Sequence, residues 1–532
     1  MGFLRVSPSS APQLAHDIPP IPATRSLADR SLNRRSFLAA GTALTGSLLF
    51  AGGATAASQA APVRRAQLVP QRAEGSSRAT SWPTPPTGSS LVVTDLEIVT
   101  LTPTSVTFSW TTRTGLQTSD DTVPPLHAAD TEVRLAPALH RGTLPSIYHD
   151  PTPRGVHLIT IRGLTPNTRY RFECRSQNIV ASPSLITTNR VNEPTATGQF
   201  TTLTQPPGDY VTTVAFINDT HIGETPQGLI LGVYPPPIQQ LPGRDPYPTV
   251  MLRETLRELR NQGIRHLFIN GDCTSEARPA EVAAFRGLLK AFGTYQRHWF
   301  VTRGNHDRPH TPSSDPTAHY EDFPVLAGTK NHRDPWGMAF VPRQKMWETR
   351  IGNLRVIGLD STRLDAPNGE IGLSQFTQLR RTLANDPNMP TIVMCHHPVT
   401  RESALTNVAG PSFILNKKDR DTTLQNILAT TPGAFLMVSG HTHRAKRVAP
   451  DQAQNVDFLE TASTKDYPCG YTLVHLYTGG YTVNFHRTSS PGALEWASRS
   501  RWSVNGLSAT VLLGSTADRN YTRQCDLSRL AH

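Results

Sequence analysis

Two histidines close together in the second half of the chain have the spacing of paired metal ligands. The sequence Gly440-His441-Thr442-His443 follows the apolar run 434–438, which predicts a buried strand that ends in a tight turn. Glycine tolerates the backbone angles of such a turn, and the small Thr442 lets the two imidazoles diverge towards neighbouring points. A single His-x-His also occurs in solvated loops, so the metal interpretation needs support from elsewhere in the chain.

Four further clusters of metal-ligand residue types also follow apolar runs. Taken alone, Asp219 or Asp272 could cap a turn or a helix. In the same way, His306 could be a surface residue and His396 a hydrogen-bonded core residue. Together the clusters supply the carboxylate, amide and imidazole groups that a two-metal site needs. They are Asp219-x-His221, Gly271-Asp272, Gly304-Asn305-His306-Asp307 and Cys395-His396-His397-Pro398.

These clusters need a scaffold that brings strand ends together. Helix and strand patterns alternate from residue 211 onward, which predicts a layered α/β domain with buried strands, and ligands collect at strand ends in such sheets. A hairpin is predicted over 471–485, with its turn at Thr478-Gly479-Gly480. The predicted helices are 249–261, 280–292, 374–384 and 419–428, and the other predicted strands are 211–217, 265–270, 298–302, 354–359 and 391–394.

The ordered set of five motifs resembles the calcineurin-like metallophosphoesterases, over roughly residues 211–487. The resemblance implies a sandwich of two sheets flanked by helices, a centre of two divalent metal ions, and hydrolysis of phosphate esters. His306 would be the non-ligand histidine that assists the departing oxygen. One metal would be held by Asp219, His221, Asp272 and His443, and the other by Asp272, Asn305, His396 and His441, with Asp272 bridging the two.

Two positions affect the details of this centre. His396 or His397 could be the ligand of the fourth motif, and the family pattern favours the first of the pair. Ser275 stands three residues after Asp272, where the purple acid phosphatases have the tyrosine that binds ferric iron. A ferric, purple site is therefore not expected, and manganese, zinc or ferrous iron would suit the mixed nitrogen and oxygen ligands.

The ligand set predicts a mechanism without a protein nucleophile. Two divalent cations would lower the pKa of a bridging water enough to give hydroxide at neutral pH, and would hold the phosphate oxygens during in-line attack. The chain contains no Gly-x-Ser-x-Gly or Walker-type motif. The ligands do not distinguish a phosphomonoesterase from a phosphodiesterase. The alternative function is a non-catalytic, cell-wall-associated binding protein on the same scaffold, although every ligand position carries a suitable side chain.

The first 56 residues look like a bacterial twin-arginine export signal. Arg34-Arg35 precedes a mildly apolar run that ends near Phe50, and Ala54-Thr55-Ala56 offers a cleavage site. The run is too short and too rich in Gly, Ser and Thr for a stable membrane anchor. We therefore expect a secreted or cell-envelope-associated protein with the twin-arginine export machinery as a partner. Residues 57–89 are rich in Pro, Ser, Ala and Arg, and should form a flexible linker.

Net charge and cysteine content limit the expected partners and disulfides. The net charge is +11, and cleavage after residue 56 would remove five Arg and two Asp and leave about +8. That mild excess suits an anionic substrate, and without a basic stripe interleaved with aromatic residues it does not indicate nucleic acid as a dedicated partner. The five cysteines imply no disulfide framework, although a pair between Cys469 and Cys525 is left open. The oligomeric state is not predicted.

Short alternating segments predict an all-β sandwich over residues 90–205. The segments 104–110 and 163–170 resemble the fibronectin type III-like sandwich that precedes the catalytic domain of purple acid phosphatases. The resemblance implies structural roles for Trp110 and Tyr170, and no chemistry is assigned to this domain. The catalytic domain is expected over 210–487, with a C-terminal extension, 488–532, that packs on it.

Overall fold

The structure is a computed structural model of the chain. It describes residues 70–71, 91–115, 123–183, 193–225, 227, 237–308, 334–363, 367–407, 409–503, 506 and 508–531. The predicted export signal and nearly all of the predicted linker lie outside the described residues. Within the described residues, no helix is long and apolar enough to cross a membrane.

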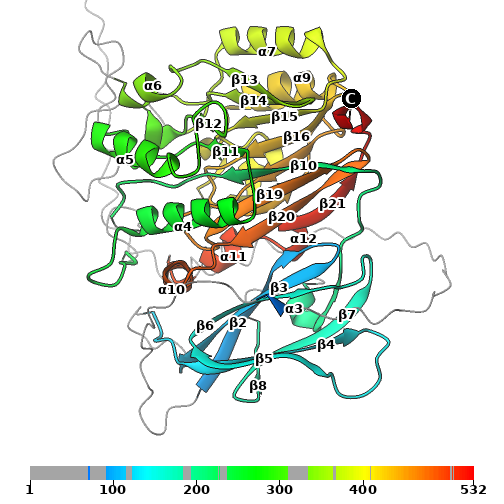
Figure 1. Cartoon of the computed structure of the whole chain (residues 1–532). Helices are drawn as coiled ribbons and strands as arrows, with labels where there is room; N and C mark the ends of the chain where they lie inside the picture. Colours follow the sequence, from blue (N-terminus) through cyan, green and yellow to red (C-terminus); the bar gives the residue numbers. More distant parts are fainter. Residues whose placement is uncertain are drawn as a thin grey trace, which may run out of the picture. The chain divides into compact units, whose positions relative to one another are not determined.

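The N-terminal part is a sandwich of two antiparallel sheets (Figure 1). Trp110 is fully buried between them and donates a hydrogen bond through Nε1 to Oγ of Ser176, at 3.0 Å. The hydroxyl of Tyr170 accepts a hydrogen bond from the backbone N–H of Thr165, at 3.0 Å. One sheet contains β1 (Pro70–Gln71), β6 (Val156–Arg162), β3 (Ser105–Thr114) and β2 (Leu91–Leu101) in that order. The other contains β5 (Ser146–Arg154), β4 (Ala129–Pro137), β7 (Arg169–Ser176) and β8 (Ile179–Val180), with β9 (Gln199–Thr201) also paired to β7.

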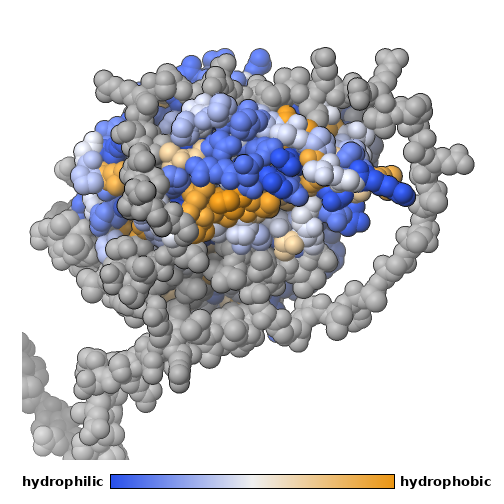
Figure 2. All heavy atoms as spheres, turned by 90° about the horizontal axis from the view of Figure 1, so that it is seen from below, coloured by the Kyte–Doolittle hydropathy of each residue, from blue (hydrophilic) through white to orange (hydrophobic). Residues whose placement is uncertain are grey.

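The surface on the sandwich side mixes hydrophilic and hydrophobic side chains. Figure 2 shows a band of hydrophobic atoms that runs between hydrophilic ones on the described part of this face. Among the described residues of the sandwich, the exposed large hydrophobic side chains are Leu139, Ile179 and Val180. A few exposed hydrophobic side chains are ordinary for a folded domain.

Two mixed six-stranded sheets form the larger part of the chain. The first has the order β12 (Trp299–Thr302), β11 (Leu267–Asn270), β10 (Tyr210–Ile217), β19 (Gly470–Tyr477), β20 (Gly480–Arg487) and β21 (Asn520–Gln524). The second has the order β13 (Trp347–Ile351), β14 (Leu354–Leu359), β15 (Thr391–Cys395), β16 (Ala434–Ser439), β18 (Asp457–Glu460) and β17 (Lys446–Val448). The hairpin predicted over 471–485 is confirmed by the pairing of β19 with β20.

The two sheets pack face to face with helices outside them, which confirms the predicted layered α/β fold. Alternate residues of β10 divide between two cores, because successive side chains of a strand point to opposite faces. Val214 and Phe216 face the core between the sheets, whereas Ala215 and Ile217 face the helices. The helices α4 (Tyr247–Asn261) and α5 (Pro279–Leu289) cover the first sheet, and α7 (Leu373–Asn385) and α9 (Gln425–Ala429) cover the second (Figure 1).

Shorter helices complete the fold. They are α3 (Pro194–Thr197), α6 (Pro335–Ala339), α8 (Arg401–Thr406), α10 (Pro491–Ser500), α11 (Ser508–Leu512) and α12 (Thr516–Arg519). The predicted helix over 419–428 is irregular, since a π-helical turn, Asp419–Leu424, precedes α9.

The C-terminal tail is part of the first sheet. Its strand β21 pairs antiparallel with β20 along five residues, from Gly480 opposite Gln524 to Asn484 opposite Asn520. The tail therefore supplies an edge strand in addition to packing on the domain. The five cysteines are free, so the pair between Cys469 and Cys525 is not formed.

Candidate metal centre

Five strands deliver the predicted ligands from their carboxyl ends. β10, β11 and β12 belong to the first six-stranded sheet, and β15 and β16 belong to the second. The amide Nδ2 of Asn270, the last residue of β11, donates to the carbonyls of Cys395, at 3.0 Å, and Val438, at 3.1 Å. This side chain joins the ends of the two sheets, so the motifs that follow the strands meet at one edge.

The backbone at most of these ligands is left-handed. Such φ angles are uncommon for residues other than glycine, and they concentrate at functional sites because the surrounding structure must hold them. Only Asn305 and His396 of the predicted ligand set have ordinary angles. The positive φ values are 50° at Asp219, 41° at His221, 48° at Asp272, 68° at His441 and 55° at His443.

The glycines of the motifs allow close approach of neighbouring loops. A Cβ atom on Gly271, which has a φ of 83°, would lie 2.6 Å from Nδ1 of His396. A Cβ atom on Gly440 would lie 2.9 Å from Oδ2 of Asp219. Both distances are too short for ordinary contact, so only glycine leaves room for the ligands beside it.

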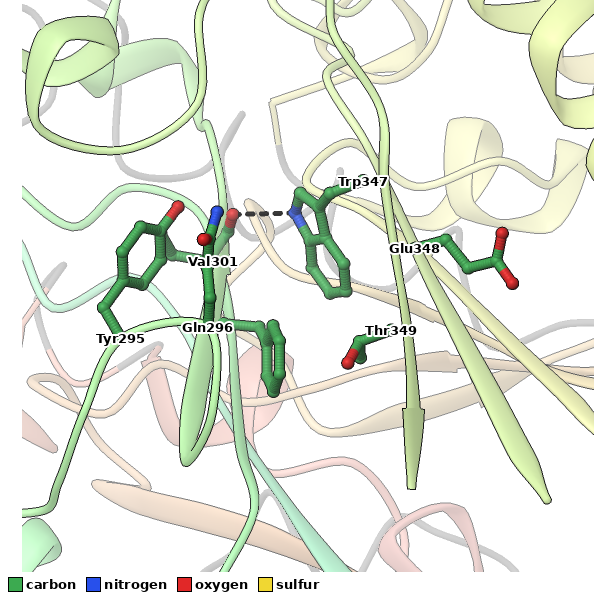
Figure 3. Close-up of a pocket in the computed structure, with 7 residues that line it drawn as sticks. Tyr295, Gln296, Val301, Trp347, Glu348 and Thr349 are labelled. Carbon is green, nitrogen blue, oxygen red and sulfur yellow. Dashed lines mark hydrogen bonds between the residues drawn. The ribbon is translucent and has the colours of Figure 1, made fainter. Parts of the chain in front are cut away.

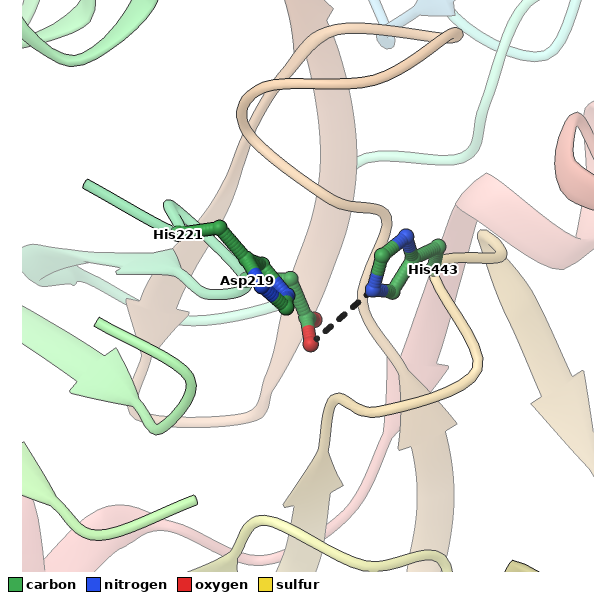
Figure 4. A group of neighbouring side chains, drawn as sticks. All are labelled: Asp219, His221 and His443. Carbon is green, nitrogen blue, oxygen red and sulfur yellow. Dashed lines mark ion pairs between the residues drawn. The ribbon is translucent and has the colours of Figure 1, made fainter. Parts of the chain in front are cut away.

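Asp219, His221 and His443 form a first group, whose ligand atoms lie within 4.8 Å of one another. Figure 4 shows the three side chains converging, and Nε2 of His443 lies 3.4 Å from Oδ1 of Asp219. The backbone N–H of His441 donates to both oxygens of Asp219, at 3.2 Å. Carboxylate and imidazole donors at these separations could hold a cation such as manganese, iron or zinc.

Asp272, His396 and His441 form a second group of the same kind. Nε2 of His396 lies 3.1 Å from Oδ2 of Asp272 and 3.1 Å from Oδ1 of Asn305. Nδ1 of His396 donates to the carbonyl of Asn270, at 2.8 Å. Because a carbonyl oxygen only accepts, this bond fixes a proton on Nδ1 and leaves Nε2 as the ring nitrogen that faces Asp272 and could bind a cation.

His397 lies beside this group but is fully engaged elsewhere. Its Nδ1 atom lies 2.8 Å from Oγ of Ser361, and its Nε2 atom lies 2.9 Å from the carbonyl of Pro367. Two ring nitrogens with such partners offer no lone pair to a cation without breaking a bond. The geometry therefore favours His396 over His397, although which of them binds metal stays a prediction.

His306 stands next to the first group. Its ring centroid lies 4.4 Å from that of His221, and its Nδ1 atom lies 2.8 Å from the carbonyl of Ser275. Its backbone N–H donates to Oδ1 of Asp272, at 2.9 Å. His306 is held at the centre by both its backbone and its ring. Ser275 orients this histidine through its backbone carbonyl.

Two ring nitrogens at the centre are left for a cation to satisfy. Both ring nitrogens of the buried His221 lack a hydrogen-bond partner, an arrangement that costs about 1–3 kcal/mol for a buried polar atom. Burial lowers the pKa of His221 well below its ordinary value, so the ring is neutral and can act as a ligand. The donor set fits two divalent cations.

The carboxylates of the centre raise the pKa of two other imidazoles. Burial alone would lower the pKa of His396, but Asp272 outweighs it and raises the pKa to about 9. In the same way, Asp219 and Asp466 raise the pKa of His443 to about 10 against the effect of burial. The centre thus carries negative charge that bound cations would neutralise.

Some residues at the centre were not predicted from the sequence. Oδ2 of Asp466 lies 2.8 Å from Nδ1 of His443 and 2.7 Å from Nζ of the buried Lys465. Lys465 also contacts Glu224, at 2.9 Å, and Glu224 lies 3.4 Å from Nδ1 of His221. Carboxylates behind metal-binding histidines fix the ring orientation. No motif marks these residues, since they meet the centre only through the fold.

Aromatic residues follow the first and third motifs, and segments 228–236 and 309–333 lie outside the described residues. Of the described ones, Trp336 is buried beneath the guanidinium of Arg303, 4.7 Å from its ring centroid. Tyr247 is also buried, and its hydroxyl donates to Oε1 of Glu224 at 2.5 Å. Neither side chain is exposed to a substrate.

A separate cavity of about 280 Å³ lies between the edge strands β12 and β13. Figure 3 shows its aromatic lining, in which Nε1 of Trp347 donates to the carbonyl of Val301, at 2.9 Å. Tyr295 and Gln296 line the other side. None of the predicted ligands lines this cavity, so it is distinct from the metal centre.

One described protein family and several solved structures are similar to this chain. Residues 212–445 match the family described as calcineurin-like phosphoesterase, and no curated protein matches the chain. The chain is similar to a purple acid phosphatase isolated from yellow lupin (Lupinus luteus) seeds, with 14% identity, a TM-score of 0.39, and coverage of 84% of this chain and 76% of the other. It is also similar to a dimetal phosphatase from Danio rerio, with 13% identity, a TM-score of 0.36, and coverage of 53% and 98%.

A third similar structure is that of PhoD, with 11% identity, a TM-score of 0.32, and coverage of 75% of this chain and 87% of the other. The three TM-scores lie below 0.5, so the match over residues 212–445 is what identifies the domain. This segment contains all five motifs. Residues 212–445 form a calcineurin-like metallophosphoesterase domain, an enzyme domain that hydrolyses phosphoric esters with two divalent metal ions.

Proposed function

We propose that the chain is an exported phosphoesterase, in which Asp272 is shared by two divalent cations and His306 assists the leaving group. One observation carries this proposal. Oδ2 of Asp272 lies 3.6 Å from Nε2 of His221 and 3.1 Å from Nε2 of His396, so one buried carboxylate oxygen faces imidazoles of both groups. Two-metal hydrolases need such a shared ligand, because their cations lie only about 4 Å apart.

The predicted ligands divide into two sets around this carboxylate. Divalent cations held there would supply Lewis acidity towards phosphate oxygens and would lower the pKa of water enough to give hydroxide at neutral pH. One cation would be held by Asp219, His221, Asp272 and His443, and the other by Asp272, Asn305, His396 and His441.

The protein itself positions the substrate and moves the proton. Asp219, Asp272 and His396 are buried, whereas His306, His441 and His443 are partly exposed. The partly exposed histidines mark the side from which a phosphate ester can enter. The Nδ1 atom of His306 contacts the carbonyl of Ser275, so we assign to Nε2 the protonation of the departing oxygen.

Export and substrate class rest on the sequence. The paired Arg34-Arg35 motif and the small-residue cleavage site support transport by the twin-arginine route to the cell envelope or the medium. The mildly basic chain supports an anionic ester as substrate. A phosphomonoester and a phosphodiester would use the same ligands.

The test is a chelation and add-back experiment on the purified full chain. After removal of metal, the protein is assayed with a chromogenic phosphomonoester and a chromogenic phosphodiester while manganese, zinc or ferrous iron is restored. We expect turnover to vanish on chelation and to return with two metal ions per chain. The preferred ester identifies the substrate class.

A second outcome would support the non-catalytic alternative. If the protein takes up two metal ions but hydrolyses neither ester, the phosphoesterase proposal fails and a binding role on this scaffold is favoured. If it takes up no metal, the ligand assignment fails as well.

A further inference from the structure

The loop between β18 and β19, residues 461–469, lies behind one half of the metal centre and is called the bracing loop here. The backbone N–H of Ser463 donates to the carbonyl of His443, at 3.3 Å, and its Oγ atom donates to the carbonyl of Asp219, at 2.9 Å. The side chain of Asp466 contacts Nδ1 of His443, at 2.8 Å. The loop therefore fixes two ligands of the first group, but none of the described contacts joins it to His396.

The other side of the bracing loop contacts the N-terminal sandwich. The hydroxyl of Tyr467 donates to Oε1 of Glu97, a residue of β2. Both side chains are buried, at 1% and 2% exposure. Arg487 contacts Oε2 of Glu97, at 2.8 Å, and donates through Nε to the carbonyl of Pro468, at 2.9 Å. The carboxylate of Glu97 is thus bound to the loop directly through Tyr467 and indirectly through Arg487.

Apolar side chains also connect the sandwich to the bracing loop. Val99, two residues along β2 from Glu97, packs in one buried cluster with Ala445, Ala462 and Phe485. Ala445 comes two residues after His443, and Ala462 belongs to the bracing loop. A strand of the sandwich therefore packs against two segments that follow His443, one directly after it and one in the bracing loop.

We propose that Glu97 of the sandwich is a positioning residue for the metal centre, which acts through Tyr467 and the bracing loop to fix His443 and Asp219. The inference rests on the proposed two-metal function. It assigns to the sandwich a role in holding one of the two metal ions. Since partners behind a metal ligand typically change metal affinity by about 10–100-fold, the expected effect is measurable.

Tyr467→Phe is the most selective variant. It removes only the hydroxyl that reaches Glu97 and leaves the ring between the guanidinium groups of Arg487 and Arg501, at 5.2 and 5.5 Å from its centroid. Glu97→Gln removes the charge from the other end of the same bond. Both variants lie outside the predicted ligand set.

Tyr481→Phe is a matched control for the loss of a buried hydroxyl. Tyr481 is also buried and donates to a buried carboxylate, Oδ2 of Asp457, at 2.6 Å. Neither residue contacts the bracing loop through a described hydrogen bond. A general loss of stability should therefore affect Tyr467→Phe and Tyr481→Phe alike, whereas a loss of metal positioning should affect only the first.

The experiment measures manganese binding to the metal-free full chain by calorimetry, with unfolding midpoints measured in parallel. We expect wild type to bind two ions, and Tyr467→Phe and Glu97→Gln to bind one of them about tenfold or more weakly while the other is unchanged. Tyr481→Phe should bind both as wild type does. Excess manganese should restore turnover in Tyr467→Phe.

Two outcomes would overturn the inference in distinguishable ways. If wild type binds two ions and Tyr467→Phe binds both equally well, with only a lower unfolding midpoint, Glu97 has a structural role alone. If wild type binds no manganese, zinc or ferrous iron, the proposed function fails and the inference fails with it.

Discussion

Nε2 of His396 lies 3.1 Å from Oδ2 of Asp272, although the two residues follow strands of different sheets. The contact is buried, since the exposed fractions of the two side chains are 0% and 2%. His396 and the neighbouring His306 and His221 hold the pKa of Asp272 well below its usual range, against the effect of burial. Asp272 is therefore ionised and ready to act as the shared ligand.

Asp272→Asn should abolish most of the turnover. Asparagine keeps the size of the side chain and tolerates the left-handed backbone at this position, so the variant removes mainly the negative charge. Loss of a ligand common to both cations should lower kcat/KM on the order of 1,000-fold, and the metal content should fall below two ions per chain. Metal analysis and steady-state assays check this. Asp245→Asn, at an exposed ion pair with Arg253, is the control.

His306→Gln should affect substrates according to their leaving groups. A general acid contributes about 100- to 10,000-fold where the departing oxygen needs a proton, so hydrolysis of an alkyl phosphate should fall by that factor. A nitrophenyl ester, whose leaving group departs without a proton, should lose much less. Metal content should remain at two ions per chain. Equal losses for both esters would contradict the proton-donor role, and a loss of metal would make His306 a ligand.

The two adjacent histidines of the fourth motif should differ sharply when replaced. His396→Ala removes the imidazole that faces Asp272 and Asn305, and should reduce both metal content and turnover. His397→Ala removes contacts with Ser361 and Pro367, and should cost about 1–3 kcal/mol of stability while two ions still bind. Metal analysis with denaturant unfolding separates the effects. Metal loss in His397→Ala alone would reverse the assignment.

The sandwich should make the protein sensitive to mild acid. His157 is fully buried, 4.7 Å from the ring of Trp110, and burial, with the charge of Arg154, lowers its pKa to about 3. An unfolded histidine has a pKa of about 6.5, so the unfolded state binds more protons below that pH. The stability from a neutral His157 is present above pH 6.5 and is lost as the pH falls towards 3.

This linkage predicts a loss of about 2 kcal/mol between pH 7 and pH 5 from His157 alone. In His157→Gln the side chain cannot be protonated, so the difference between the two pH values should shrink by about that amount. Denaturant unfolding at pH 7 and pH 5 measures it. A variant as acid-sensitive as wild type would show that His157 is not the residue responsible.

The strand-end motifs were predictable because each depends on local sequence. An apolar run sets the strand, a glycine such as Gly271 or Gly440 permits the turn, and the ligand follows at once. The alternation of helices and strands similarly predicts the layered fold. The sequence could not show that His397 has both nitrogens engaged, since Ser361 and Pro367 reach it only through tertiary packing.

The long-range contacts could not be predicted from the sequence, because they also depend on tertiary packing. Asp466 and Lys465 precede a Tyr-Pro pair without any motif, and their position behind His443 depends on the path between β18 and β19. In the sequence, nothing distinguishes Glu97 from other polar residues of a strand. Its contact with Tyr467 arises only when the sandwich packs on the catalytic domain.

The strand β21 has a consequence for any attempt to isolate the catalytic domain. A fragment cut at residue 487 would lack β21 and leave the backbone groups of β20 unpaired along Gly480 to Asn484. It would also lose the bonds from Arg519 and Asn520 to the carbonyls of Ile98 and Val99. An uncovered sheet edge is a template for other copies of the same chain. Aggregation on expression, with every metal ligand still present in the sequence, is therefore the expected first symptom of that truncation.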